Sequence, residues 1–388
     1  MSGGANGVVE VAGAVDVAGI EAQLRDLWEQ LAGVEQQQES HPVMRACVQN
    51  LLVWAPDAQG ASAGEAEAAV SQAMVDVTID HPSRIMVFLP NGAGDRAGEL
   101  EAWVTAQCHK LGKHQQVCCE QIMVAVGDER REHLPSLVRP LLVADLPTVM
   151  WWRAAPAFGE PSFESLADCT ERVIIDAERA PRGIAGLIEL ARAVVGQPAS
   201  RRVTDLAWSR ATPWRIAVAE VFDVEEHRAR LPNLASVEIQ CDRLTPECGA
   251  AAHAEVGAES LLLAGWLASR LGWQPVGAPR SKDGVVELSL SSATGKAVTM
   301  RIKPAEQHGA DGTQAITLSD GEATFTVNNA GERQLDVVAD SPASQSPDRR
   351  VSAESMDEGP LLSRELAVLS SDGIYKQVLT FFSELGKE

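Results

Sequence analysis

The sequence predicts an α/β fold, with an N-terminal, mostly parallel, doubly wound-like sheet domain and a C-terminal α+β domain with an antiparallel meander. Up to about residue 180, continuous apolar runs alternate with helical segments, as in βαβ units. Five short strands with alternating polar and apolar residues then follow between residues 285 and 340. We expect three parts: a helical arm at 1–45, the α/β domain at 46–180 and the α+β domain at 181–388, which carries the meander and the C-terminal helices.

The arm is predicted from helical spacing over residues 19–34. Ile20, Leu24, Leu27 and Leu31 recur every three or four residues, and Asp16 precedes them as a candidate N-cap. Two interpretations stay open: the helix packs on its own domain, or it docks on another subunit.

The α/β domain is predicted from buried apolar runs and the segments between them. Strands are expected at 50–56, 84–92, 116–127, 148–153 and 172–177, and helices at 63–82, 99–112, 131–147 and 163–171. The strand at 116–127 is longer and more polar than the others. We therefore expect it to lie nearer an edge of the sheet or to pair antiparallel.

The second domain should begin with helices. They are expected at 183–196, at 204–231 (one long helix or a pair, with Thr204 as N-cap) and at 259–273, with a strand at 235–241. In the meander, the Asp320-Gly321 pair is typical of a hairpin turn. Two short helices end the chain, the second capped by Asp372.

Composition limits the classes of function. Net charge is −21 and no run is rich in Lys or Arg, so nucleic acid is not an expected partner, whereas a protein with a basic face is. No apolar run approaches the roughly 18–20 residues of a membrane span, and no secretory signal is recognisable. An odd count of seven cysteines favours a reducing cytoplasm.

The chain lacks the common catalytic and nucleotide-binding motifs. It has no GxxxxGK[ST], no GxGxxG after a strand, no GxSxG and no HExxH. We therefore expect no catalytic residues, no cofactor and no metal.

One stretch concentrates thiols and imidazoles: Cys108, His109, His114, Cys118 and Cys119. Adjacent residues of a strand point to opposite faces, so one metal could not easily bind both Cys118 and Cys119. Bonding these two to each other would need a strained turn. A disulfide from one of them to Cys47, Cys108 or Cys169 stays open. We expect one thiol in the core and one near the surface, with Cys118 and Cys119 as candidate redox thiols.

Tryptophan–arginine pairs are the candidate partner-binding residues. Trp152 and Arg153 end a predicted strand, and Trp214 and Arg215 occupy a predicted helix corner, while Trp28 lies on the arm. Tryptophan and arginine often dominate interfaces. The plainer interpretation is core packing for the indoles and a local ion pair for Arg153.

The order of several motifs resembles the glucose-6-phosphate dehydrogenase assembly protein (OpcA) family. The most specific are "QCHKLGKHQQVCCEQI" and "DLPTVMWWR", accompanied by "NLLVWAPD", "HPSRIMVF", "DLAWSRATPWR" and "LLLAGWLASRLGW". The resemblance covers the chain from about residue 9, apart from a linker near 340–358.

The resemblance implies a non-catalytic protein that binds glucose-6-phosphate dehydrogenase, promotes its active oligomer and raises its activity allosterically. It also implies a place in the oxidative pentose phosphate pathway and a possible redox response. An alternative is an enzyme or sensor that binds a sugar phosphate at the carboxyl end of the α/β sheet near Arg153, where parallel sheets bind ligands.

Overall fold

A computed structural model describes residues 16–35, 43–56, 63–90, 100–111, 115–181, 183–241, 255–305, 312–331, 334–342, 349–352, 357–368 and 370–385. The chain divides into two compact units. Unit 1 is Met1–Ile175, Pro198–Thr204 and Asp357–Ser371; unit 2 is Asp176–Gln197, Asp205–Met356 and Asp372–Glu388. The main division thus falls at residue 175, close to the expected boundary at 180, and unit 1 also includes two segments from later in the chain.

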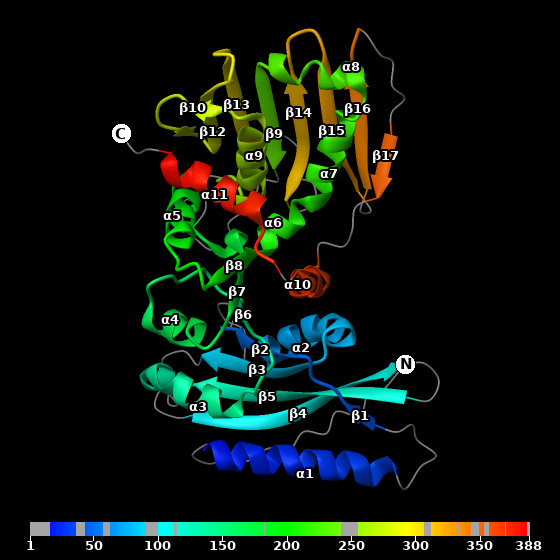
Figure 1. Ribbon diagram of the computed structural model, residues 1–388, viewed down its shortest axis with the longest axis vertical. Helices are drawn as coiled ribbons and strands as arrows, with labels where there is room; N and C mark the ends of the chain where they lie inside the picture. Colours follow the sequence, from blue (N-terminus) through cyan, green and yellow to red (C-terminus); the bar gives the residue numbers. More distant parts are fainter. Residues whose placement is uncertain are drawn as a thin grey trace. The chain divides into compact units, whose positions relative to one another are not determined.

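Unit 1 is built on a mostly parallel sheet (Figure 1). The strand order is β1-β5-β3-β2-β6-β7-β8, and β4 pairs antiparallel with β5. The strands are β1 (Val43–Arg45), β2 (Gln49–Trp54), β3 (Ser83–Pro90), β4 (Leu100–Leu111), β5 (Gln115–Val126), β6 (Thr148–Trp152), β7 (Arg172–Ile175) and β8 (Arg202–Asp205). Strands β2, β3, β6 and β7 are buried along their whole length, which explains their continuous apolar sequences.

The helices of unit 1 pack on this sheet or on one another. They are α1 (Val17–Glu35), α2 (Ala63–Asp80), α3 (Leu134–Leu141, after the 3₁₀ turn η1, Asp128–His133), α4 (Pro161–Ala167) and α10 (Glu358–Ala367). The carboxylate of Asp16 accepts a hydrogen bond from the Gly19 amide at 2.6 Å, which confirms Asp16 as the N-cap of α1. Helix α1 packs on β4, β1 and α3 of its own unit, so the first of the two interpretations of the arm is the one observed.

The helix predicted at 99–112 is wrong, because this segment is strand β4. It pairs with β5 from Leu100 to Leu111. Its Ala102, Val104 and Ala106 are buried with a period of two, whereas the neighbours Glu101, Trp103 and Thr105 are less buried. Glu, Ala and Leu favour helices intrinsically, but a complete ladder with β5 outweighs that weak preference. The expectation that the 116–127 strand pairs antiparallel is confirmed by this ladder.

Unit 2 contains a second, mostly antiparallel sheet, with the order β10-β12-β13-β9-β14-β15-β16-β17 and β11 paired to β12. Its strands are β9 (Ser236–Cys241), β10 (Gln274–Pro275), β11 (Arg280–Lys282), β12 (Val285–Ser291), β13 (Ala297–Pro304), β14 (Thr313–Ser319), β15 (Thr324–Gly331), β16 (Gln334–Asp340) and β17 (Arg349–Ser352). The predicted meander is interrupted, because β9 lies between β13 and β14 and runs parallel to β13. Such an insertion leaves no local sequence signal.

The helices of unit 2 are α5 (Gly183–Val195), α6 (Leu206–Arg210), α7 (Thr212–Val221), α8 (Glu225–Arg228), α9 (Ala258–Leu271) and α11 (Gly373–Glu384), with 3₁₀ turns η2 (Ala177–Arg179) and η3 (Leu231–Asn233). The N-cap predicted at Thr204 is wrong by one position: Asp205 caps α6 by accepting a hydrogen bond from the Ala207 amide. Asp372 caps α11 as expected. Over the described ranges given above, no helix has the length and apolarity of a membrane span.

Candidate redox and partner-binding site

One face of β5 carries both Cys118 and Glu120. The two residues are two positions apart in a strand, so their side chains point the same way. Helix α1 lies over this face and buries Ile20, Leu24 and Leu27. The sequence therefore folds locally into a helix-on-sheet layer that holds Cys118 and the Glu120 carboxylate beneath α1.

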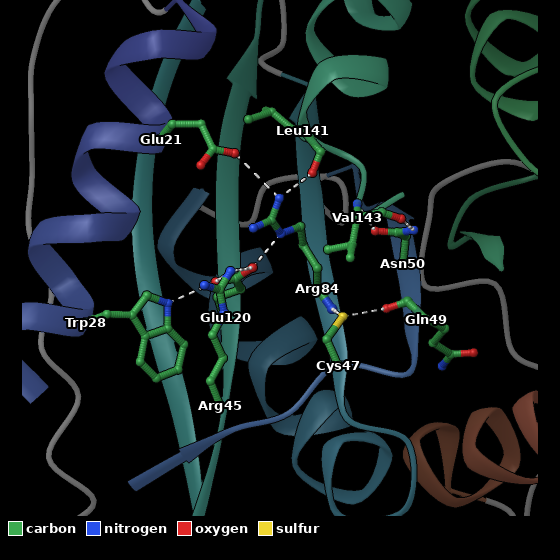
Figure 2. A network of polar contacts seen from close by, with 10 residues as sticks. All are labelled: Glu21, Trp28, Arg45, Cys47, Gln49, Asn50, Arg84, Glu120, Leu141 and Val143. Atoms are coloured by element: carbon green, nitrogen blue, oxygen red, sulfur yellow. Dashed lines mark hydrogen bonds and ion pairs between the residues drawn. The ribbon is translucent and has the colours of Figure 1, made fainter. Parts of the chain in front are cut away.

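Glu120 is the centre of a polar network under α1 (Figure 2). Its side chain is 3% exposed and forms an ion pair with the almost equally buried guanidinium of Arg84. Arg45 Nη2 lies 2.8 Å from Glu120 Oε2, and the indole Nε1 of Trp28 donates to the same oxygen at 3.0 Å. One buried carboxylate thus links α1, β1, β3 and β5, and these donors together offset the cost of removing its charge from water.

Arg84 extends the network to α1 and α3. Its Nη1 donates to the Leu141 carbonyl at 2.6 Å and lies 3.5 Å from Glu21 Oε1. The Arg84 backbone N–H donates to Cys47 Sγ at 3.2 Å, and the Cys47 thiol donates to the Gln49 carbonyl at 3.3 Å. Burial raises the pKa of Cys47, so this thiol stays protonated at neutral pH.

Cys118 forms a disulfide with Cys108, its direct neighbour across the β4–β5 ladder. Cys118 is fully buried, whereas Cys108 is partly accessible. Arg45 lies opposite Cys118 in the β1–β5 register. The disulfide therefore joins the two strands beneath α1, two residues along β5 from the carboxylate that binds Trp28.

Cys119 has a different environment from Cys118. It is a free thiol on the opposite face of β5, as the alternation of side chains predicted. It is also buried, so the expectation of one thiol near the surface is wrong. The reason is that helices pack on both faces of this layer, α1 on one and α2 on the other. Burial raises the pKa of Cys119 to about 11. His109 follows Cys108 on β4; burial lowers its pKa, and its Nε2 lies 2.5 Å from Thr78 Oγ1. His114 lies outside the described residues, among which no group of His, Cys, Asp and Glu could hold a metal.

The carboxyl end of the unit 1 sheet is occupied by aromatic side chains. Trp54 and Trp152 stack with ring centroids 4.9 Å apart and an interplanar angle of 1°. Phe163 packs edge-on against Trp152, and the Trp152 indole donates to the Ala155 carbonyl at 2.9 Å. The guanidinium of Arg153 pairs with Glu358 at 2.9 Å. These contacts match the plainer interpretation of Trp152 and Arg153, and none of them favours a sugar-phosphate site.

Trp214 and Arg215 lie in unit 2, at the first turn of α7. Trp214 is 2% exposed. Arg215 stacks on the Trp208 ring with its guanidinium carbon 3.4 Å from the centroid, and donates to the Trp208 carbonyl and to Thr212 Oγ1. The pair therefore forms the packed helix corner that contains "TPWR".

Two family models match this chain, and both describe the "glucose-6-phosphate dehydrogenase subunit", one domain each. The model of the N-terminal domain matches residues 75–192, and the model of the C-terminal domain matches residues 201–379. The chain belongs to the OpcA family. The resemblance in the motifs is thereby confirmed over most of the chain.

Curated relatives agree with this assignment. The chain is 28% identical over 225 residues to the "OxPP cycle protein OpcA" of Synechocystis sp., and the match covers 58% of the chain and 42% of that protein. It is 30% identical over 204 residues to the protein of the same name from Nostoc punctiforme, covering 52% and 40%. The matches thus span about two fifths of the length of these relatives.

The solved structures that match this chain include oxidoreductases. A 3-ketoreductase from Actinomadura kijaniata has a TM-score of 0.49 at 11% identity, covering 86% of this chain and 95% of its own. Levoglucosan dehydrogenase has a TM-score of 0.45 at 13% identity, covering 86% and 90%. At these values the likeness carries no inference about chemistry.

The structure brings together two predictions that the sequence kept apart. Trp28, predicted as a partner-binding residue, and Cys118, predicted as a redox thiol, share one face of the β4–β5 layer. The sequence left Cys108 open as one of three possible disulfide partners of Cys118 or Cys119, and the structure pairs it with Cys118. Sequence reasoning missed Arg84 and Glu120 as members of this site. They are charged residues inside apolar strands, and that is a signal that could have identified them.

Proposed function

We propose that this chain is a non-catalytic assembly factor and allosteric activator of glucose-6-phosphate dehydrogenase in the oxidative pentose phosphate pathway, and that the Cys108–Cys118 disulfide makes it redox-responsive. Membership of the OpcA family supports the choice of partner. The observation that carries the redox part is that the disulfide lies on the face of β5 that also binds α1 through Glu120.

An activator needs only a difference in affinity between two states of its target. It must bind the active conformation of the dehydrogenase more tightly than the inactive one. A tenfold shift corresponds to about 1.4 kcal/mol. A change in how firmly one helix is held can supply a difference of this size, so the proposal requires no catalytic group.

The redox step is a thiol–disulfide exchange. A dithiol reductant attacks one sulfur of the pair, the Cys108–Cys118 bond breaks, and a second thiol of the reductant completes its own disulfide. Two electrons pass to the protein, and both cysteines end as thiols. The partly accessible Cys108 is the sulfur that the reductant would reach. Since β4 lies at the edge of the sheet and underlies α1, reduction removes a covalent restraint beneath α1.

Trp28, Arg153 and Arg215 are the proposed contacts with the dehydrogenase. All three are partly exposed, and each already has a partner that fixes its orientation: Glu120 for Trp28, Glu358 for Arg153 and Trp208 for Arg215. Trp152 and Trp214, predicted with them from the sequence, are buried and could act only by supporting the adjacent arginines. We place the protein in the cytoplasm, where cellular dithiols would set the state of the disulfide.

The deciding experiment is a dehydrogenase assay with and without this protein and with and without a dithiol reductant. We expect no turnover by this protein alone, and a change in dehydrogenase rate or substrate affinity that reductant alters. A Cys108→Ser variant should be insensitive to reductant, whereas Cys119→Ser and Cys169→Ser should respond like the original protein. Unchanged kinetics and oligomer size of the dehydrogenase would refute activation; identical activation in all redox states would refute only the redox part.

A further inference from the structure

The sheet of unit 2 has one face without helices in the described part of the chain. Helix α7 packs on β15 and β16, and α9 packs on β9 and β13, on one side of the sheet (Figure 1). The apolar side chains of these strands point to that side and are buried. Alternate residues of the same strands point to the other face and are only partly buried. Many of these residues form hydrogen bonds and ion pairs with one another, across or along the strands.

The strand register assembles these outward residues into continuous rows. One row runs Glu287, Arg301, Glu238, Thr317, Thr326 and Val338 from β12 to β16. A second row runs Ser289, Thr299, Ser236, Ser319, Thr324 and Asp340 across the same strands. We call the surface formed by these rows, together with Lys303, Gln240, Ala315, Asn328, Asp336 and Arg350, the open face. Its centre, on β14 and β15, contains only small or uncharged side chains.

Charge distinguishes the open face from the rest of the chain. The whole sequence has 54 acidic and 33 basic residues. The open face has the basic residues Arg301, Lys303 and Arg350 and the acidic residues Glu238, Glu287, Asp336 and Asp340. Two copies of this acidic chain that approach each other through other surfaces repel each other. When they approach through the open face, the two surfaces that meet are close to neutral.

Charge position also suits a twofold contact. The strand order places Arg301 and Lys303 on β13, near one side of the face, and Asp336 and Asp340 on β16, near the other. A twofold axis along the strands sets β13 of one copy against β16 of the other. In a contact of this kind, Arg301 and Lys303 of each copy lie opposite Asp336 and Asp340 of the other. Both sides are close to neutral, because Glu287 and Glu238 pair with the two basic residues and Arg350 pairs with Asp336.

The size of the open face is sufficient for a dimer. Strands lie about 4.8 Å apart and rise about 3.4 Å per residue, so seven strands of about seven residues cover on the order of 800 Å². A standard interface covers roughly 800 Å² on each partner. Two sheets that pack face to face lie about 10 Å apart. The short side chains at the centre of the open face would allow two copies to approach to that distance.

We propose that the open face is the contact between two copies of this chain in a sheet-to-sheet homodimer. The contact goes beyond the proposed activation of the dehydrogenase and does not depend on it. Thr317 and Thr326 lie at its centre, opposite each other on β14 and β15.

The test is the mass of the purified full chain in solution, measured by light scattering after gel filtration over a range of concentrations. We expect about twice the monomer mass of 41.4 kDa. A Thr317→Arg, Thr326→Arg variant should give the monomer mass, because it buries like charges against each other. Thr380→Arg, which makes the same change on the helix α11, should remain a dimer.

Three results would overturn the proposal. They are a monomeric original protein at all concentrations, a dimer that the double arginine variant does not dissociate, and an open face protected from hydrogen exchange only when the dehydrogenase is added. Circular dichroism of each variant confirms folding. A single Thr317→Cys variant gives a second measurement, because a residue near the twofold axis should crosslink two copies under oxidising conditions.

Discussion

Glu120 and Arg84 form an ion pair in which both side chains are more than nine-tenths buried. A buried charge that loses its partner costs about 3–5 kcal/mol, whereas exposed pairs contribute about 0–1 kcal/mol. A Glu120→Gln variant keeps the shape of the side chain and removes the buried counter-ion of Arg84, which then has only the half-exposed Glu21 at 3.5 Å. We expect its free energy of unfolding to fall by about 3–5 kcal/mol in urea denaturation.

The matched control for that variant is Glu220→Gln. Glu220 on α7 pairs with Arg349, but the two side chains are 37% and 50% exposed. Loss of this pair should change the free energy of unfolding by less than about 1 kcal/mol. Equal effects of the two substitutions would contradict the assigned role of burial.

The disulfide should stabilise unit 1 in addition to any regulatory role. Cys108 and Cys118 are ten residues apart, and closing a loop of that length removes entropy from the unfolded chain corresponding to about 2–3 kcal/mol. We expect a Cys108→Ala, Cys118→Ala variant to unfold at correspondingly lower denaturant concentration. Reductant should destabilise the original protein by the same amount and leave the double variant unchanged; a double variant as stable as the original would rule out this contribution.

The parallel strands of unit 1 could be predicted because buried strands require continuous apolar runs, as in β3 and β6. Strand β4 could not, because its Glu, Ala and Leu residues favour a helix locally and only pairing with β5 decides the outcome. The same error left the disulfide partner undecided among Cys47, Cys108 and Cys169, since a helix would have pointed Cys108 away from any fixed partner. The place of β9 between β13 and β14 depends on pairing between distant segments, which adjacent residues do not encode.

The candidate site was partly predictable for a related reason. Alternation along β5 correctly separated Cys118 from Cys119. The Glu120 network needed three further segments of the chain to converge, including Arg45 and Arg84 from separate strands. Residue types alone could have identified the charged positions inside apolar runs, but not which opposite charge would lie beside each of them.

Gly265 allows α9 and α11 to pack closely in unit 2. A Cβ atom at this position would lie 2.4 Å from Phe382 Cε2 and 2.9 Å from Val378 Cγ1. Alanine favours a helix by about 1 kcal/mol over glycine, but overpacking a core costs about 1–3 kcal/mol. Because Phe382 is fully buried, we expect the clash to dominate and Gly265→Ala to lower the melting temperature.

Gly373 provides the matched control for Gly265. It is the first residue of α11, and a Cβ atom there meets nothing within 4 Å. Gly373→Ala should therefore leave the melting temperature unchanged, or raise it slightly because alanine has a higher helix propensity than glycine. If both alanine variants behave alike, close packing is not the reason for a glycine at position 265.

Buried carboxyl groups should make the stability of unit 2 depend on pH near neutrality. Burial, with the nearby Asp176 charge, raises the pKa of Asp205 to about 7. Burial, with the Glu178 charge, raises the pKa of Glu259 to about 7. Arg210 pairs with Asp176, so it does not fully neutralise the other carboxylates of this cluster.

The sign of the effect follows from proton binding. Between about pH 4 and 7 the native state holds protons that the unfolded chain releases, so the free energy of unfolding falls as pH rises through this window and levels off above it. Asp205 accepts hydrogen bonds from the Ala177 and Ala207 amides through Oδ1 and from the Tyr375 hydroxyl through Oδ2. Asp205→Asn keeps a side-chain oxygen that can accept the two backbone amide hydrogen bonds. Its neutral side chain mimics the protonated carboxyl group.

Urea denaturation at several pH values between about 5 and 8 measures the slope of the free energy of unfolding against pH. We expect Asp205→Asn to flatten it and to be more stable than the original protein at the upper end of the range. Asp320→Asn is the control: although burial raises the pKa of Asp320, hydrogen bonds from the Ala323 amide and the Arg230 guanidinium outweigh this and lower it, which keeps its titration below this window. A slope that is the same in all three proteins would show that Asp205 is ionised in the native state throughout, and that its hydrogen bonds outweigh the cost of its burial.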